Sequence, residues 1–208
     1  RNEKIQLMNL HATLDLIDVA DRLDIPTFIG AGSIHETEAI YEMSENRIIK
    51  NRGLMYKSAK LAAHYMGKAK CGYTGIRFFW PIITNAYGEG EISDRLISSA
   101  IRKLLCGSTL NVSEGEQLYD FIYIDDVANA FYLIGKKGID GRNYIIGSGH
   151  PQPLYKYLKI VERFVNDMVS YPQYIRLGFG KKTQYVINLP ESSFETRTLT
   201  EDTGFYPR

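Results

Sequence analysis

The chain has few cysteines, no long apolar run and almost no net charge. Its two cysteines, Cys71 and Cys106, are far apart and belong to no Cys-x-x-Cys pair. We therefore expect neither a disulfide framework nor a zinc site, and we interpret both as small buried apolar residues. No stretch reaches the roughly 18 consecutive apolar residues that a membrane-spanning helix needs. Residues 1–4 do not lead into a signal-peptide core, so we expect a cytoplasmic protein.

The charge balance argues against two further classes of partner. The 25 Lys and Arg residues nearly equal the 24 Asp and Glu residues, and the formal net charge is +1. These charges are spread along the chain, so no basic patch indicates a nucleic acid or an anionic membrane. The histidines do not stand at metal-binding spacings from one another or from acids, so we predict no metal site; they are His11, His35, His64 and His150.

What the chain does have is the composition of an ordinary globular protein. It contains 208 residues, of which 44% are hydrophobic and 24% charged. This is enough to bury a sizeable core. No internal repeat, low-complexity tract or linker is visible, so we expect one domain, or one large domain with a small lobe.

The order of elements predicts an α/β fold. Apolar residues at a spacing of three or four predict a helix over Leu7–Leu23, and Thr27–Ser33 is typical of a short buried strand that ends in small residues. Helices and buried strands in alternation are typical of a parallel sheet, whose ligands bind at the carboxyl ends of the strands. Further strands are expected at 73–79, 120–124 and 143–147, and further helices at 52–70, 92–105, 127–134 and 154–168.

Two details of this assignment are specific enough to be tested. The polar residues 34–51 are expected to form an irregular surface segment. Asp125 and Asp126 precede the helix expected from Val127, and we interpret them as its N-terminal cap.

Three residues have the chemistry of a proton-transfer site. Tyr56 and Lys60 are four residues apart on an expected helix and therefore project from one face. A phenol is a weak acid, and a fixed cation nearby favours its ionised form, which general acid–base catalysis at neutral pH requires. Ser33 lies at the end of the expected strand, where its hydroxyl could hold a substrate oxygen beside the phenol. The alternative is a helix on which the Tyr covers the core edge and the Lys is solvated.

Two glycine-rich turns follow expected strands, Gly30-Ala31-Gly32 and Gly147-Ser148-Gly149. Each begins like a Gly-x-Gly-x-x-Gly dinucleotide fingerprint and lacks the third glycine, so neither is a convincing pyrophosphate cradle. Small residues at 30–32 would let a flat ring approach the backbone at the strand end. The surroundings of Ser33 do not have the Gly-x-Ser-x-Gly spacing of a hydrolase.

Ser33, Tyr56 and Lys60 in this order resemble the extended short-chain dehydrogenases/reductases. More narrowly, the chain resembles the NAD-dependent epimerase/dehydratase family that acts on nucleotide sugars. Further segments that are similar to family motifs are Arg77-Phe78-Phe79-Trp80-Pro81, Asn85-Ala86-Tyr87-Gly88, Gly115–Ala128, Asn143–Gly147 and Thr203–Pro207. The resemblance implies a Rossmann-type doubly wound parallel sheet, of which this chain holds the C-terminal portion, with a small α+β substrate-binding lobe. We expect residues 1–81 to belong to the NAD(P)-binding domain and residues 82–208 mainly to the lobe, with segments near 120–147 returning to the sheet.

The resemblance also implies roles for individual residues. Tyr56 would be the acid–base residue, Lys60 would hold the nicotinamide ribose and favour the ionised phenol, and Ser33 would orient the reacting oxygen. NAD or NADP would be bound by Ala31, Gly32, Tyr56, Lys60, Phe79 and Pro81. A nucleotide-sugar substrate would be contacted by His35, Trp80 and Asn85. The family also implies a homodimer.

The departures from the family pattern narrow the expected reaction. The glycine fingerprint of the cofactor domain is absent, because the chain begins late by comparison with the family. Trp80 stands where an Asn is usual, Asn85 lies farther from Arg77 than expected, and Tyr119 replaces an Arg that binds phosphate. Sugar 4,6-dehydratases carry Asp-Glu directly after the serine or threonine, and here Ile34-His35 stand there. We therefore expect an epimerase or 4-ketoreductase. The alternative is a non-catalytic NAD(P)-binding protein of the same fold, acting as a sensor or subunit.

Overall fold

The centre of the molecule is a parallel sheet. The computed structural model describes residues 3–44, 53–168, 177–180 and 188–208. Residues 77–87 form the middle of the sheet and pair in parallel on both sides. On one side, β3 (Arg77–Phe79) pairs with β1 (Thr27–Ile29), and β4 (Ile82–Ile83) pairs with β2 (Gly32–Ser33). On the other side, β4 pairs with β9 (Ile145–Ile146), and β5 (Asn85–Tyr87) pairs with β8 (Phe121–Tyr123).

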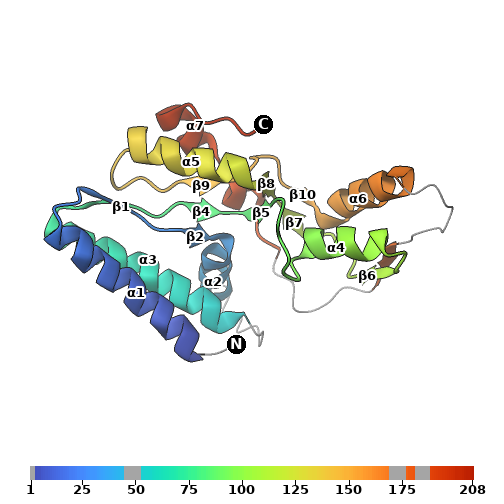
Figure 1. Ribbon diagram of the computed structural model, residues 1–208, viewed down its shortest axis with the longest axis horizontal. Helices are drawn as coiled ribbons and strands as arrows, with labels where there is room; N and C mark the ends of the chain where they lie inside the picture. Colours follow the sequence, from blue (N-terminus) through green and yellow to red (C-terminus); the bar gives the residue numbers. More distant parts are fainter. Residues whose placement is uncertain (1–2, 45–52, 169–176, 181–187) are drawn as a thin grey trace.

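Helices cover both faces of this sheet (Figure 1). The helices α1 (Glu3–Arg22) and α3 (Leu54–Thr74) lie on one face, and α5 (Ile124–Lys137) and α7 (Arg197–Thr203) lie on the other. Successive side chains of a strand point to opposite faces. Phe78 and Trp80 accordingly join the core beneath α1 and α3, whereas Phe79 joins the core beneath α5 and α7. The predicted doubly wound parallel α/β fold is confirmed.

A second lobe extends from one end of the sheet (Figure 1). It contains α4 (Leu96–Leu105) and α6 (Leu154–Met168), with β6 (Leu110–Val112) in parallel pairing with β11 (Leu177–Phe179). The short strands β7 (Leu118–Tyr119) and β10 (Gln152–Pro153) pair antiparallel. A short 3-10 helix, η1 (Glu191–Phe194), brings Phe194 into a small core with Ile34. The lobe has a core of its own, formed by Ala100, Leu104, Leu110, Leu154, Leu158 and Val165. The predicted domain boundary at residue 81 stays a prediction. Helices α5 and α7 belong to the second part of the chain, but they cover the sheet.

The prediction of an irregular segment over residues 34–51 is wrong for its first part. Residues Ile34–Ser44 form helix α2. The Ser33 hydroxyl accepts from the His35 backbone N–H at 3.4 Å, and the Ser33 N–H donates to Glu36 Oε1 at 2.9 Å. The contact of Glu36 with the Ser33 N–H is one half of a capping box, and the Ser33 hydroxyl caps the N–H of His35; such contacts start a helix even in a polar sequence. Residues 45–52 lie outside the described residues.

Three smaller expectations are also corrected. The strand expected from Tyr73 begins only at Arg77, because α3 continues to Thr74 and is ended by Gly75 at a φ of 77°. Asp125 and Asp126 do not cap α5, which begins at Ile124; Asp126 instead accepts from the backbone N–H of Arg208. Cys71 is buried as predicted, but Cys106, at the end of α4, is exposed.

Candidate active site

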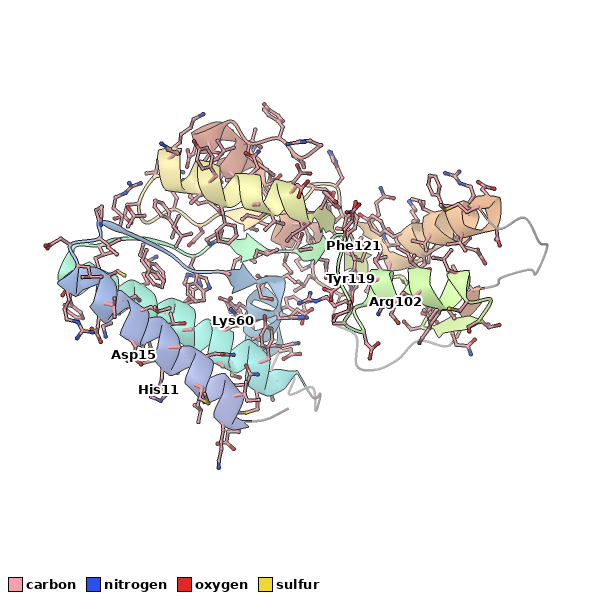
Figure 2. The ribbon with its side chains drawn as sticks, viewed as in Figure 1. His11, Asp15, Lys60, Arg102, Tyr119 and Phe121 are labelled. Carbon is pink, nitrogen blue, oxygen red and sulfur yellow. The ribbon has the colours of Figure 1, made fainter. Side chains whose placement is uncertain are left out.

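One cavity brings together the three residues that the sequence singled out. Ser33, Tyr56 and Lys60 all line a cavity of about 470 Å³. Ser33 ends β2, and Tyr56 and Lys60 lie one turn apart near the start of α3. Figure 2 shows Lys60 on α3, where this helix passes α2 and β2. The hydroxyl, the phenol and the ammonium therefore border the same space.

The ammonium of Lys60 is held at the cavity by the strand and by an aromatic ring. Its Nζ donates to the Ala31 carbonyl at 2.9 Å and lies 5.6 Å from the centre of the Trp80 ring. Partial burial lowers the pKa of Lys60, and the negative charge of Glu36 opposes this shift. The contact with Ala31 fixes the ammonium one residue away from the Gly32-Ser33 strand.

Tyr56 is half-buried and has an aromatic neighbour. The ring of His35 meets the Tyr56 ring edge-on, at 5.8 Å between centres and 83° between planes. The His35 Nδ1 lies 2.8 Å from Glu38 Oε2, so the imidazole is held beside the phenol by a carboxylate on the same helix. His35 itself is exposed and lies outside the residues that line the cavity.

Another part of the cavity lining is charged, and the sequence reasoning missed it. Glu89, Glu91 and Arg95 line this part. Arg95 Nε lies 3.6 Å from Glu91 Oε2, and hydrogen bonds from Ser93 lower the pKa of Glu91. The available signal was the position of these residues, in a glycine-rich loop directly after the carboxyl end of β5.

The other predicted ligand residues lie outside the lining of this cavity. Phe79 is fully buried in the core, and Arg77 lies over its ring. Pro81 is buried beside Trp80, whose indole Nε1 donates to Glu36 Oε1 at 3.1 Å. Asn85 donates to the carbonyl of Asp120 through its backbone N–H and its side-chain amide. Ala31 and Gly32, by contrast, do line the cavity.

Both glycine-rich turns have a packing explanation. A Cβ at Gly30 would overlap the Trp80 ring, and one at Gly32 would lie 2.8 Å from Trp80 Cδ1. The flat ring that approaches this strand end is therefore the protein's own tryptophan. At the second turn, a Cβ on Gly147 would overlap the Asp120 carboxylate, which accepts hydrogen bonds from both Ser148 and Gly149. Burial raises the pKa of Asp120, and these hydrogen bonds oppose the shift.

Two kinds of feature are absent from the part of the chain that the structure describes. Within residues 3–44, 53–168, 177–180 and 188–208, no three His, Cys, Asp or Glu side chains stand together as a possible metal site. None of the helices in these ranges is both long and apolar enough to cross a lipid bilayer.

The comparison with known families agrees with the cavity and the sheet. The profile of the NAD dependent epimerase/dehydratase family matches residues 1–147. The chain belongs to this family. Within the NAD-dependent epimerase/dehydratase family, the chain is 24% identical over 159 residues to a dTDP-glucose 4,6-dehydratase from Escherichia coli. That match covers 74% of this chain and 44% of the relative, so the chain spans less than half of the curated protein it matches.

Solved structures of the epimerase/dehydratase type share the fold. The epimerase Mth375 from Methanothermobacter thermautotrophicus superposes with a TM-score of 0.77 at 14% identity, covering 99% of this chain and 62% of that one. DesIV from Streptomyces venezuelae, a dTDP-glucose 4,6-dehydratase with NAD and TYD bound, gives a TM-score of 0.75 at 17% identity, covering 98% and 62%. At these identities the likeness establishes the fold alone.

Proposed function

We propose that the protein is an NAD(P)-dependent nucleotide-sugar epimerase or 4-ketoreductase with Tyr56 as its acid–base residue. The observation that carries the proposal is the convergence of Ser33, Tyr56 and Lys60 on one cavity of about 470 Å³. A hydroxyl, a phenol and an ammonium around one space can hold an oxygen and move its proton. Membership of the NAD-dependent epimerase/dehydratase family supports the cofactor class.

The residues present fit the nicotinamide end of such a cofactor. The cavity wall beside the ammonium consists of small or apolar side chains, including Ala31, Ile83 and Ala86, which leave room for a flat ring. Thr84 also belongs to this wall, and among the described residues its buried Oγ1 has no hydrogen-bond partner. Lys60, with one donor on Ala31, has further donors for ribose hydroxyls. A bound NAD or NADP would supply hydride transfer to or from the sugar carbon.

The chain's own residues would then handle the sugar oxygen. Ser33 would hold the reacting oxygen, while Tyr56 would accept its proton as the carbon is oxidised, or return one as a ketone is reduced. The Lys60 ammonium would hold the ribose of the cofactor beside this oxygen. Each of these steps needs only groups that border the cavity.

The surroundings of Ser33 favour epimerase or reductase chemistry over dehydration. Elimination of water needs an acid and a base at the sugar. The residues directly after Ser33 are Ile34, which is buried in a small apolar core, and His35, which lies outside the cavity lining. The next acid, Glu36, is 1% exposed and hydrogen-bonded through both oxygens. Dehydration, the activity in the name of the E. coli relative, is therefore the second candidate.

The test is a product analysis with the full-length protein. A panel of UDP-, dTDP-, GDP- and CDP-hexoses, with the corresponding 4-keto sugars where they can be made, would be incubated with NAD, NADH, NADP or NADPH and followed by proton NMR. We expect inversion at a sugar carbon or reduction of a 4-ketone. A 4-keto-6-deoxy product would instead identify a dehydratase. Cofactor binding without conversion of any sugar would favour the non-catalytic binding protein.

Two further features accompany this proposal. The predicted homodimer would use α1 and α3, whose outward sides expose large apolar residues: Met8, Leu16, Met55, Tyr65 and Met66. The cytoplasmic location predicted from the sequence is also part of the proposal. Both remain predictions that accompany the enzyme assignment.

A further inference from the structure

Glu36 is a carboxylate that is buried next to the cavity without lining it. It lies in the first turn of α2 and is 1% exposed. Removing a carboxylate from water costs a large amount of free energy unless hydrogen bonds or opposite charges replace the water. The position of Glu36 is therefore informative, because the fold must supply its partners.

The partners of Glu36 come from three different elements. Its Oε1 accepts from the Ser33 backbone N–H at 2.9 Å and from the Trp80 indole at 3.1 Å. Its Oε2 lies 3.1 Å from His64 Nδ1. One side chain thus joins the end of β2, the segment after β3 and the middle of α3.

Two of these contacts lead to the candidate catalytic residues. Ser33 is bound directly through its backbone. Lys60 is reached through Trp80, because the Lys60 Nζ lies 5.6 Å from the centre of the indole ring that Glu36 holds. His64 lies one turn beyond Lys60 on α3. Its ring stacks on that of Trp80, with 5.5 Å between the ring centres and 17° between the planes. We call Glu36, His64 and Trp80 the Glu36 cluster.

We propose that Glu36 is a positioning residue of the candidate active site: its buried carboxylate fixes the Ser33 backbone and, through Trp80, the place of the Lys60 ammonium. The proposal rests on the function proposed above for Ser33 and Lys60. Glu36 touches neither the cavity nor a reacting atom, so it acts through its neighbours. The negative charge of Glu36 also raises the pKa of Lys60, against the lowering by burial, and so helps to keep the ammonium charged.

A purely structural role is the competing explanation. A capping box needs only the contact between Ser33 and the acid three residues later. This structural role would not require the Trp80 indole as a second donor to Glu36 Oε1, nor any effect of Glu36 on Lys60. The two explanations therefore differ in what happens to Trp80 and Lys60 when Glu36 is replaced.

The first experiment uses the full-length protein and needs no substrate. Trp80 is the single tryptophan of these 208 residues, and its indole N–H signal is assigned as the one that Trp80→Phe removes. Glu36→Gln keeps the shape and removes the charge. We expect this variant to move the indole N–H resonance and to lower the pKa of Lys60, followed by ¹³C NMR of labelled lysine side chains. The matched control is Glu42→Gln, since Glu42 is also buried on α2 but contacts Lys57 instead.

The results of this experiment decide whether Glu36 is a positioning residue. If a folded Glu36→Gln variant leaves both the indole signal and the Lys60 titration unchanged, the positioning role is wrong. It is equally wrong if Glu42→Gln changes both signals as much as Glu36→Gln does. Should Glu36→Gln not fold, Glu36→Asp keeps the charge and shortens the reach; we expect it to move the indole signal while Lys60 titrates close to the wild-type pH, and an unmoved indole signal would overturn the proposal.

The second experiment measures turnover in the full-length protein. Because a misplacement of about 1 Å in a site can cost about a hundredfold in rate, we expect Glu36→Gln to lower kcat at least about tenfold, with KM within about twofold. The alkaline limb of the pH–rate profile should move to lower pH, as the pKa of Lys60 falls. An unchanged kcat and profile would contradict the proposal. If no variant, including wild type, turns over any nucleotide sugar, the proposed function fails, and the NMR experiment still decides the role of Glu36.

Discussion

Two buried acidic clusters join α2 to α3, and they differ in the partners of their carboxylates. In the Glu36 cluster, the carboxylate accepts from a backbone N–H, an indole and an imidazole. In the second, which we call the Lys57 cluster, Lys57 Nζ lies 2.7 Å from Glu38 Oε2 and 3.1 Å from Glu42 Oε1. Lys57 is only 4% exposed. The Glu36 cluster is held together by hydrogen-bond donors that connect it to the cavity, and the Lys57 cluster by opposite charges.

This difference in partners indicates that the Glu36 cluster supports the site, whereas the Lys57 cluster supports the fold. The Lys57 cluster lies between α2 and the start of α3, and it pairs one ammonium with two carboxylates. It adjoins the cavity through Lys57, which directly follows Tyr56 in α3, and through His35, which contacts both Glu38 and the Tyr56 ring. The Glu36 cluster reaches Ser33 and Lys60 by direct contacts. We therefore expect changes in the Lys57 cluster to affect stability most, and changes in the Glu36 cluster to affect the site.

The largest stability effect should come from Lys57→Met. This change leaves the buried carboxylate of Glu42 and the partly buried carboxylate of Glu38 without their cation, and breaking a buried ion pair from one side typically costs about 3–5 kcal/mol. Urea unfolding of the variant should show a loss of this order, with the indole N–H signal of Trp80 near its wild-type position. Lys68→Met, at an exposed position of the same helix, is the control. A Lys57 variant as stable as that control would contradict the assignment of the Lys57 cluster.

A middle-sized effect is expected from Gly30→Ala. The added Cβ would overlap the Trp80 ring, and overpacking of this kind typically costs about 1–3 kcal/mol. The matched control is Gly72→Ala in α3, where nothing lies within 4 Å of the added Cβ. There the change should instead stabilise the helix, by roughly 0.5–1 kcal/mol. Thermal or urea unfolding of both variants checks the pair, and equal effects would show that Trp80 does not press on Gly30.

The smallest effect is a pH dependence of the Lys57 cluster. Burial raises the pKa of Glu38, but hydrogen bonds and charges from His35 and Lys57 outweigh it, and the pKa lies below the usual 4.5. A carboxylate whose pKa is lowered by folding stabilises the protein above the unfolded-state pKa, and this contribution is lost as the pH falls through the folded-state pKa. The stability difference between wild type and Glu38→Gln should therefore narrow as the pH falls below about 4.5. A stability difference that stays constant below about pH 4.5 would contradict the lowered pKa of Glu38.

The sequence predicted the regular parts of the fold and three residues that line the same cavity. The apolar spacing of Leu154–Met168 matches α6 at both ends, and the positions of Ser33, Tyr56 and Lys60 were sufficient to bring them to one cavity. These features depend on local periodicity and on the rule that parallel strands present their carboxyl ends together.

The parts that were missed depend on contacts between distant residues. Helix α2 could have been found, because Ser33 and Glu36 have the spacing of a capping box. The partners of Glu36 could not, since Trp80 lies 44 positions away and meets it only in the folded chain. The requirement for glycine at position 30 could not be predicted either, because it comes from the Trp80 ring, which leaves no room for a Cβ. Phe121, where the sheet meets the second lobe (Figure 2), is likewise placed against Tyr157 of α6, with 4.9 Å between the ring centres.

The most direct measurement of the central claim is the turnover of Tyr56→Phe in the full-length protein, beside its affinity for NAD or NADP. Removing one hydroxyl leaves the ring and its contact with His35 in place. We expect turnover to fall by about a hundredfold to ten-thousandfold, the usual contribution of an acid–base group, while cofactor binding is retained. Tyr73→Phe, at an exposed position of the same helix, should leave both unchanged. Wild-type turnover in Tyr56→Phe would contradict the claim that Ser33, Tyr56 and Lys60 form a proton-transfer site.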